Sequence, residues 1–62
     1  MITKEDVKDY FGQIFEVEKE MEQRYTYLAQ NISDQVYKEK FERLAKEEIG
    51  HQNLINETLK KL

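Results

Sequence analysis

Residues 7–32 read VKDYFGQIFEVEKEMEQRYTYLAQNI, and apolar side chains recur along this stretch at steps of three and four residues. Such spacing predicts one long amphipathic helix with a heptad-like apolar stripe. The stripe consists of Val7, Phe11, Ile14, Met21, Tyr25, Leu28 and Ile32. Its one double step passes over Glu18, so this carboxylate lies on a face that we expect to be buried.

Capping residues mark the ends of this helix. Thr3 is a favourable N-cap, and Asp6 follows three residues later, where it can face the free amides of the first turn. At the other end, Asn31 tolerates the left-handed conformation that ends many helices, and Ser33 or Asp34 can cap a second helix. The predicted elements are a helix at about 4–31, a turn at about 31–34 and a helix at about 34–61.

The second helix carries a stripe of its own, again at steps of three and four residues. It consists of Tyr37, Phe41, Leu44, Glu48, His51, Ile55, Thr58 and Leu62. A turn this short makes the two helices antiparallel neighbours. The sequence therefore predicts an all-α protein whose residues 1–62 form a single domain, an antiparallel two-helix hairpin.

Length and composition indicate that the hairpin needs a stabilising partner. The 62 residues include no Cys, so neither disulfides nor thiolate metal sites are available. Below about 70–80 residues a single core rarely contributes more than ~3–5 kcal/mol. Because two helices cannot enclose a core, we expect a homodimer that closes into a four-helix bundle, or a higher multiple of it.

The charge pattern disfavours two classes of partner. The 10 basic and 13 acidic residues are interleaved, and no basic block suggests nucleic-acid binding. No apolar run approaches the ~18 residues of a membrane span, and the N-terminus has no signal-peptide core. We therefore expect a cytoplasmic protein that binds neither nucleic acid nor membrane.

Three ionisable residues lie on the stripes: Glu18, Glu48 and His51. Counted from the turn, Glu18 and Glu48 fall at nearly the same level, and His51 follows one helical turn later on the same face as Glu48. A two-fold axis at this level would assemble four carboxylates and two imidazoles. That set suits two divalent ions of iron or manganese, because the four negative charges balance two dications.

Two stretches resemble the ligand helices of rubrerythrins. EKEMEQRYTYLA (residues 18–29) is similar to the first, which carries an Arg-Tyr-Thr-Tyr run with the ligand Glu seven residues before its first Tyr. LAKEEIGH (residues 44–51) is similar to the second, where Ala-x-Glu-Glu-x-x-His is common. Together they cover roughly residues 11–55.

The resemblance implies a ferritin-like four-helix bundle with two iron ions per dimer, or manganese in their place. It makes Glu18 the first ligand, Glu48 the bridging ligand and His51 the terminal one. Tyr25 would lie beside the site, as an electron donor or as a hydrogen-bond partner of a ligand. The expected reaction is oxidation of Fe(II) by O2 or H2O2, as a ferroxidase or as a rubrerythrin-like peroxidase.

The sequence departs from rubrerythrins in holding one helix pair and no four-cysteine rubredoxin module, so a peroxidase would need a separate electron donor. A single pair that shares its site across a dimer is similar in arrangement to the encapsulated ferritins, which work inside a protein shell. The alternative function is a structural or interaction module whose metal only stabilises the assembly. A metal-free coiled coil is the third interpretation, since Glu-x-x-His recurs by chance on helices.

Three further carboxylates are accessory candidates. Glu20 is the alternative first ligand, because Tyr27 also follows it by seven residues, but Glu20 lies off the apolar stripe. Glu22 and Glu47 flank the proposed ligands and are either solvated side chains or additional carboxylates that guide or coordinate the metal.

Overall fold

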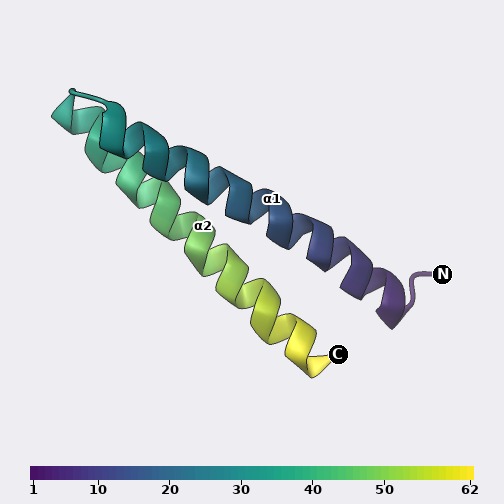
Figure 1. Cartoon of the computed structure of the whole chain (residues 1–62). Coiled ribbons are helices and arrows are strands. Elements are labelled where there is room, and N and C mark those ends of the chain that lie inside the picture. The colour runs from purple at the N-terminus through teal and green to yellow at the C-terminus, as the bar shows by residue number, and fades with distance from the viewer.

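The computed structural model describes all 62 residues and contains two α-helices and no strand. Helix α1 spans Lys4–Asn31 and helix α2 spans Gln35–Lys61. They lie side by side and antiparallel, with both chain termini at the end opposite the turn (Figure 1). The molecule measures 48 × 15 × 15 Å. The all-α two-helix hairpin that the sequence predicts is thus confirmed, and neither helix is long and apolar enough to cross a membrane.

A capping box begins α1. The Thr3 hydroxyl accepts from the Asp6 amide at 3.1 Å, and Asp6 Oδ2 accepts from the Thr3 amide at 2.9 Å. Two backbone donors that the first turn cannot satisfy are therefore paired. Glu5 and Asp6 also place negative charge at the positive end of the helix dipole.

The turn differs in detail from the sequence-based expectation. Asn31 does not adopt a left-handed conformation, and no residue of the chain has a positive φ. Instead Asn31 stays helical with its side-chain amide donating to the Tyr27 carbonyl at 2.8 Å, and the extended Ile32 ends the helix. Asp34 is the N-cap of α2, because its Oδ1 accepts from the Val36 amide at 2.9 Å and from the Tyr37 amide at 3.2 Å.

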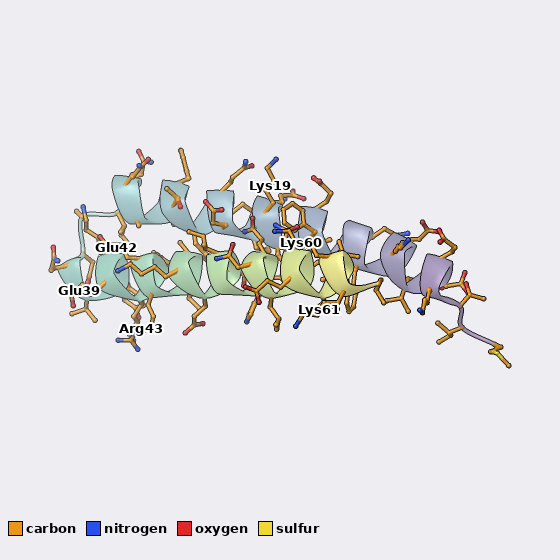
Figure 2. The ribbon with its side chains drawn as sticks, turned by 90° about the horizontal axis from the view of Figure 1, so that it is seen from below. Lys19, Glu39, Glu42, Arg43, Lys60 and Lys61 are labelled. Atoms are coloured by element: carbon orange, nitrogen blue, oxygen red, sulfur yellow. The ribbon has the colours of Figure 1, made fainter.

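The contact between the helices forms a thin core. The buried residues are only Ala29, Ala45 and Ile55. Between the turn and the middle of the hairpin, Tyr25 stacks on Phe41 with ring centroids 6.5 Å apart. Charged side chains such as Arg43 and Lys61 project away from the helix pair (Figure 2). A single hairpin therefore buries few residues fully and leaves an apolar surface of eleven large exposed side chains.

One flank of the hairpin carries much of that surface. Exposed apolar side chains recur along α1 at steps close to whole helical turns. On α2, the exposed Tyr37, the half-buried Leu44 and the polar His51 follow one another at steps of seven residues, or about two turns. On each helix, this row is rotated by about a quarter turn around the helix axis from the face that contacts the other helix. The two rotations lead to the same side of the hairpin, so the two rows lie next to each other there. We call this side the open flank. It comprises Tyr10, Ile14, Val17, Leu28, Tyr37, Leu44 and His51.

Candidate metal centre

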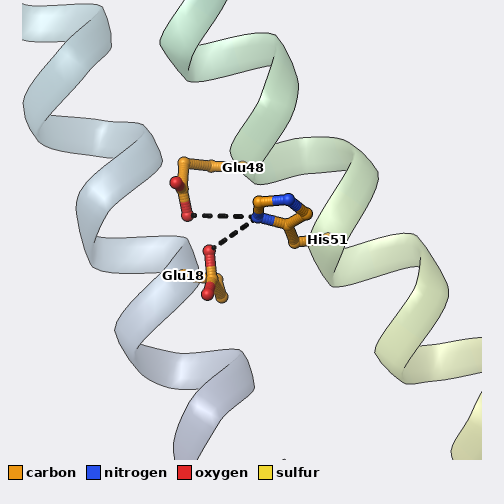
Figure 3. Close-up of side chains that lie close together, drawn as sticks. All are labelled: Glu18, Glu48 and His51. Atoms are coloured by element: carbon orange, nitrogen blue, oxygen red, sulfur yellow. Dashed lines mark hydrogen bonds and ion pairs between the residues drawn. The ribbon is translucent and has the colours of Figure 1, made fainter.

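Glu18, Glu48 and His51 meet near the middle of the hairpin. Glu18 projects from α1, and Glu48 and His51 project from successive turns of α2 toward it (Figure 3). One potential ligand atom from each of the three side chains lies within 4.8 Å of the others. The convergence follows from the short turn, which sets residue 18 opposite residue 48, and from the i, i+3 spacing of Glu48 and His51.

The imidazole faces both carboxylates. His51 Nδ1 lies 3.3 Å from Glu18 Oε2 and 4.0 Å from Glu48 Oε2. With its proton on Nδ1, the ring donates to Glu18; with its proton on Nε2, Nδ1 turns a lone pair toward the carboxylates. The second arrangement is favourable when a cation lies between them.

The three ligand candidates differ in how far their side chains are buried. The side chains of Glu48 and Glu18 are 15% and 22% exposed, whereas His51 is 58% exposed on the open flank. Glu48 Oε2 is buried without a hydrogen-bond partner, the one such side-chain atom in the chain. His51 Nδ1, at 4.0 Å, is too distant to donate a hydrogen bond to this atom. Because a charged acceptor that is buried without a hydrogen bond is costly, a cation bound at this atom would be favourable.

The donor set fits iron. Two carboxylates and one imidazole per chain make an oxygen-rich site with some nitrogen, which suits iron or manganese better than zinc. Glu48 Oε2 accepts no hydrogen bond and so offers a free lone pair to an ion. The three residues therefore offer the kinds of donor atom that an iron ion binds.

The other candidates lie outside this cluster. Glu20 is exposed and forms an ion pair with Arg24 at 2.6 Å, and Glu47 is also exposed. Tyr25 is half-buried against Phe41, and no hydrogen bond joins its hydroxyl to the cluster within one chain. Glu22 is half-buried but is bonded elsewhere.

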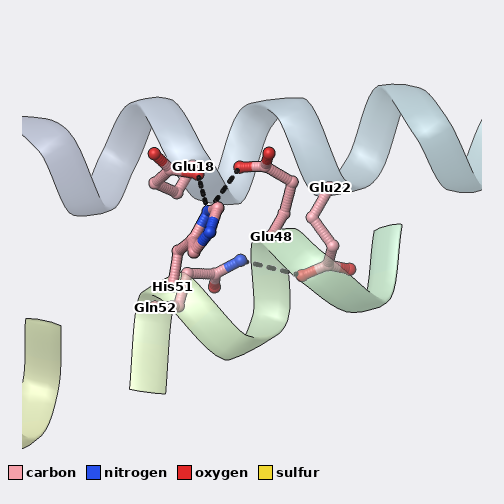
Figure 4. A network of polar contacts seen from close by, with 5 residues as sticks. All are labelled: Glu18, Glu22, Glu48, His51 and Gln52. Atoms are coloured by element: carbon pink, nitrogen blue, oxygen red, sulfur yellow. Dashed lines mark hydrogen bonds and ion pairs between the residues drawn. The ribbon is translucent and has the colours of Figure 1, made fainter. Parts of the chain in front are cut away.

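Glu22 is held by a residue that the sequence-based reasoning missed. Gln52 Nε2 donates to Glu22 Oε1 at 3.3 Å across the helix pair, alongside the cluster (Figure 4). Gln52 follows Glu48 by four residues and therefore shares the face of α2 that packs on α1. A polar residue at that spacing was the signal that could have identified it.

Comparison with known proteins identifies the relationship. The family model described as rubrerythrin matches residues 9–62, which include both helices almost completely and all three residues of the cluster. No curated protein and no solved structure gives a significant match to the chain.

Proposed function

The chain belongs to the rubrerythrin family of ferritin-like proteins, and from that premise we propose that it is a di-iron carboxylate protein that oxidises Fe(II) with O2 or peroxide. The observation that supports this proposal most directly is the Glu18–Glu48–His51 cluster with its unpaired buried oxygen. A cluster built only for stability would pair that oxygen with a donor.

Each residue of the cluster has a distinct role in the proposal. Glu48 is the most buried of the three and has an unpaired oxygen, so it is suited to bridge two ions. Glu18 supplies the carboxylate of the facing helix, and its contact with His51 orients the imidazole. His51 supplies the terminal nitrogen. Bound iron would provide the one-electron steps that reduce O2 or peroxide.

The site is proposed to be shared by two copies of the chain. Three side chains offer too few donors for two ions, whereas two copies would supply four carboxylates and two imidazoles, the ligand set of ferritin-like bundles. His51 lies on the open flank, among the exposed apolar residues that a partner would cover. A second copy would thus bury the apolar surface and complete the site in one step.

Tyr25 is proposed as an electron donor to the site. Its phenol ring lies two helical turns along α1 from Glu18, packed on Phe41 rather than in solvent.

A ferroxidase would release the oxidised iron, whereas a peroxidase would keep it and receive electrons from a separate donor protein. The alternative function is structural, with the metal holding a marginal hairpin pair together, since so few residues are buried in one chain.

Metal analysis combined with light scattering tests the site. Protein purified without chelator should contain about one iron or manganese ion per chain and have the mass of a dimer or its multiple. Glu48→Ala and His51→Ala should lose the metal, and Glu47→Ala, an exposed neighbour, should retain it. A parent protein that holds no metal and takes up no Fe(II) would contradict the proposal.

Stopped-flow oxidation then separates the activities. Anaerobic Fe(II)-loaded protein is mixed with O2 or with H2O2, and the absorbance of Fe(III) is followed with and without an added reductant. Repeated turnover of added Fe(II) with O2 indicates a ferroxidase, and repeated turnover of H2O2 with the reductant indicates a peroxidase. Oxidation no faster than in buffer, with the metal still bound, would leave the structural function.

A further inference from the structure

A second polar pair, Glu22 and Gln52, lies beside Glu18 and Glu48 across the helix contact. Glu22 follows Glu18 by four residues on α1, and Gln52 follows Glu48 by four residues on α2. Because the helices are antiparallel, Glu22 lies one helical turn from Glu18 toward the hairpin's turn, whereas Gln52 lies one helical turn from Glu48 toward the chain termini. The two pairs differ in chemistry, because the second pair combines a carboxylate with a neutral amide.

That difference decides which carboxylate is free to bind a cation. The Gln52 amide donates to Glu22 Oε1 at 3.3 Å, whereas Glu48 Oε2 has no donor. A carboxylate at position 52 could not donate, and a lysine there would cancel the charge of Glu22. The amide therefore holds one oxygen of the Glu22 carboxylate in a hydrogen bond, and Glu22 keeps its negative charge because the amide is neutral.

Glu22 starts from a position beside the cluster, but its side chain points to Gln52 and not to the cluster. Glu18 and Glu22 are neighbours on one face of α1, as residues four apart in a helix are. The Glu22 side chain runs toward α2, where it meets Gln52, while Glu48 runs in the opposite direction toward α1 (Figure 4). Glu22 has no atom in the group of converging ligand atoms.

We propose that Gln52 is a positioning residue that holds Glu22 out of the metal's ligand set, so that each chain contributes three ligands and not four. Glu22 then attracts cations by its charge without coordinating them. This inference rests on the proposed function, since it concerns the same site.

Co(II) binding to four proteins tests it: the parent, Glu22→Gln, Gln52→Leu, and the double variant. The visible absorption of Co(II) reports the number and type of its ligands and does not depend on turnover. We expect the parent, Glu22→Gln and the double variant to share one spectrum. Gln52→Leu alone should give a different spectrum and bind Co(II) about tenfold more tightly, because the released carboxylate joins the ligands.

Three results would overturn the inference. A changed spectrum in Glu22→Gln means that Glu22 is already a ligand. An unchanged spectrum in Gln52→Leu means that the amide restrains nothing. A changed spectrum that persists in the double variant means that Gln52 acts through packing. Asn53→Leu, at an exposed neighbour, is the matched control, and Gln52→Met replaces Gln52→Leu if circular dichroism shows misfolding. A parent that binds no Co(II) would overturn the proposed function as well.

Discussion

Among single residues, Glu48 carries the strongest structural argument for the proposed metal site. Its Oε2 atom is buried without a hydrogen-bond partner, 4.0 Å from the imidazole of His51. The sequence predicted that Glu48, Glu18 and His51 converge, because each is an ionisable residue on an apolar stripe and the short turn sets them at one level, and the structure brings them together. The sequence could not identify the bond between Gln52 and Glu22, since which side chains meet across a helix pair depends on how each is rotated.

Replacing Glu48 by Gln should separate the stability of the metal-free protein from that of the metal-bound one. The amide removes the unpaired buried charge, so with chelator present we expect a gain of about 1 kcal/mol, a rise in Tm of roughly 4–8 °C. The variant should lose the further rise in Tm that Mn(II) gives the parent.

Thermal melting by circular dichroism, with Mn(II) and with chelator, measures both effects. Glu47→Gln makes the same chemical change at an exposed neighbouring position and should alter neither melting temperature. If Glu48→Gln lowered the metal-free Tm, a donor unseen within one chain would have to satisfy Glu48.

The helices as elements were largely predictable. Thr3 is the N-cap that the sequence predicted, and the structure adds a reciprocal bond from Asp6. Of the two predicted caps of α2, Ser33 and Asp34, the structure uses Asp34. The position of the turn was predicted correctly, but the way in which α1 ends was not. Asn31 could either have ended α1 in a left-handed conformation or have continued the helix. Its side-chain bond to the Tyr27 carbonyl favours the helix, and this competition between local hydrogen bonds is not visible in residue preferences.

Asp34→Ala should destabilise α2 at its start. The carboxylate accepts from two backbone amides, those of Val36 and Tyr37, and both would lose their partner. The expected cost is about 1 kcal/mol, measured as a lower urea midpoint at unchanged slope. Ser33→Ala is the control, since the Ser33 side chain makes no hydrogen bond. Equal effects of the two substitutions would show that Asp34 is not the operative cap.

For the whole molecule, the sequence predicted one buried stripe on each helix, whereas the hairpin uses only part of each. Ile14, Leu28 and Tyr37 belong to the predicted stripes and remain 43%, 40% and 52% exposed. Heptad-like spacing cannot distinguish residues that face the neighbouring helix from residues on the flank beside it, because the two sets interleave. The exposed set is the surface for which we propose a second copy.

Ile14→Lys should therefore dissociate the proposed dimer. Ile14 lies on the open flank one turn from Glu18, and covering such a side chain contributes about 1.5–3 kcal/mol, so its loss should weaken self-association tenfold or more. Light scattering across a range of concentrations measures the mass, and elemental analysis should show less bound metal.

Tyr27→Lys is the matched control, because Tyr27 is 66% exposed on a different side of α1. It should leave both the mass and the metal content as in the parent. A variant Ile14→Lys that stayed dimeric with full metal content would place the interface between copies elsewhere.

The position of the termini bears on how two such hairpins could become one polypeptide. Both termini lie at the end opposite the turn (Figure 1). The cluster lies near mid-length, since Glu18 and Glu48 are central in their helices. If a two-fold axis crosses the helices at the cluster, the second copy begins at the far end of the first. A gene duplication that fused them would need a connection along the 48 Å length of the hairpin, about 14 extended residues or more. A parallel arrangement would need only a few, so the shortest linker that preserves the metal site in a tandem fusion would reveal the direction of the axis.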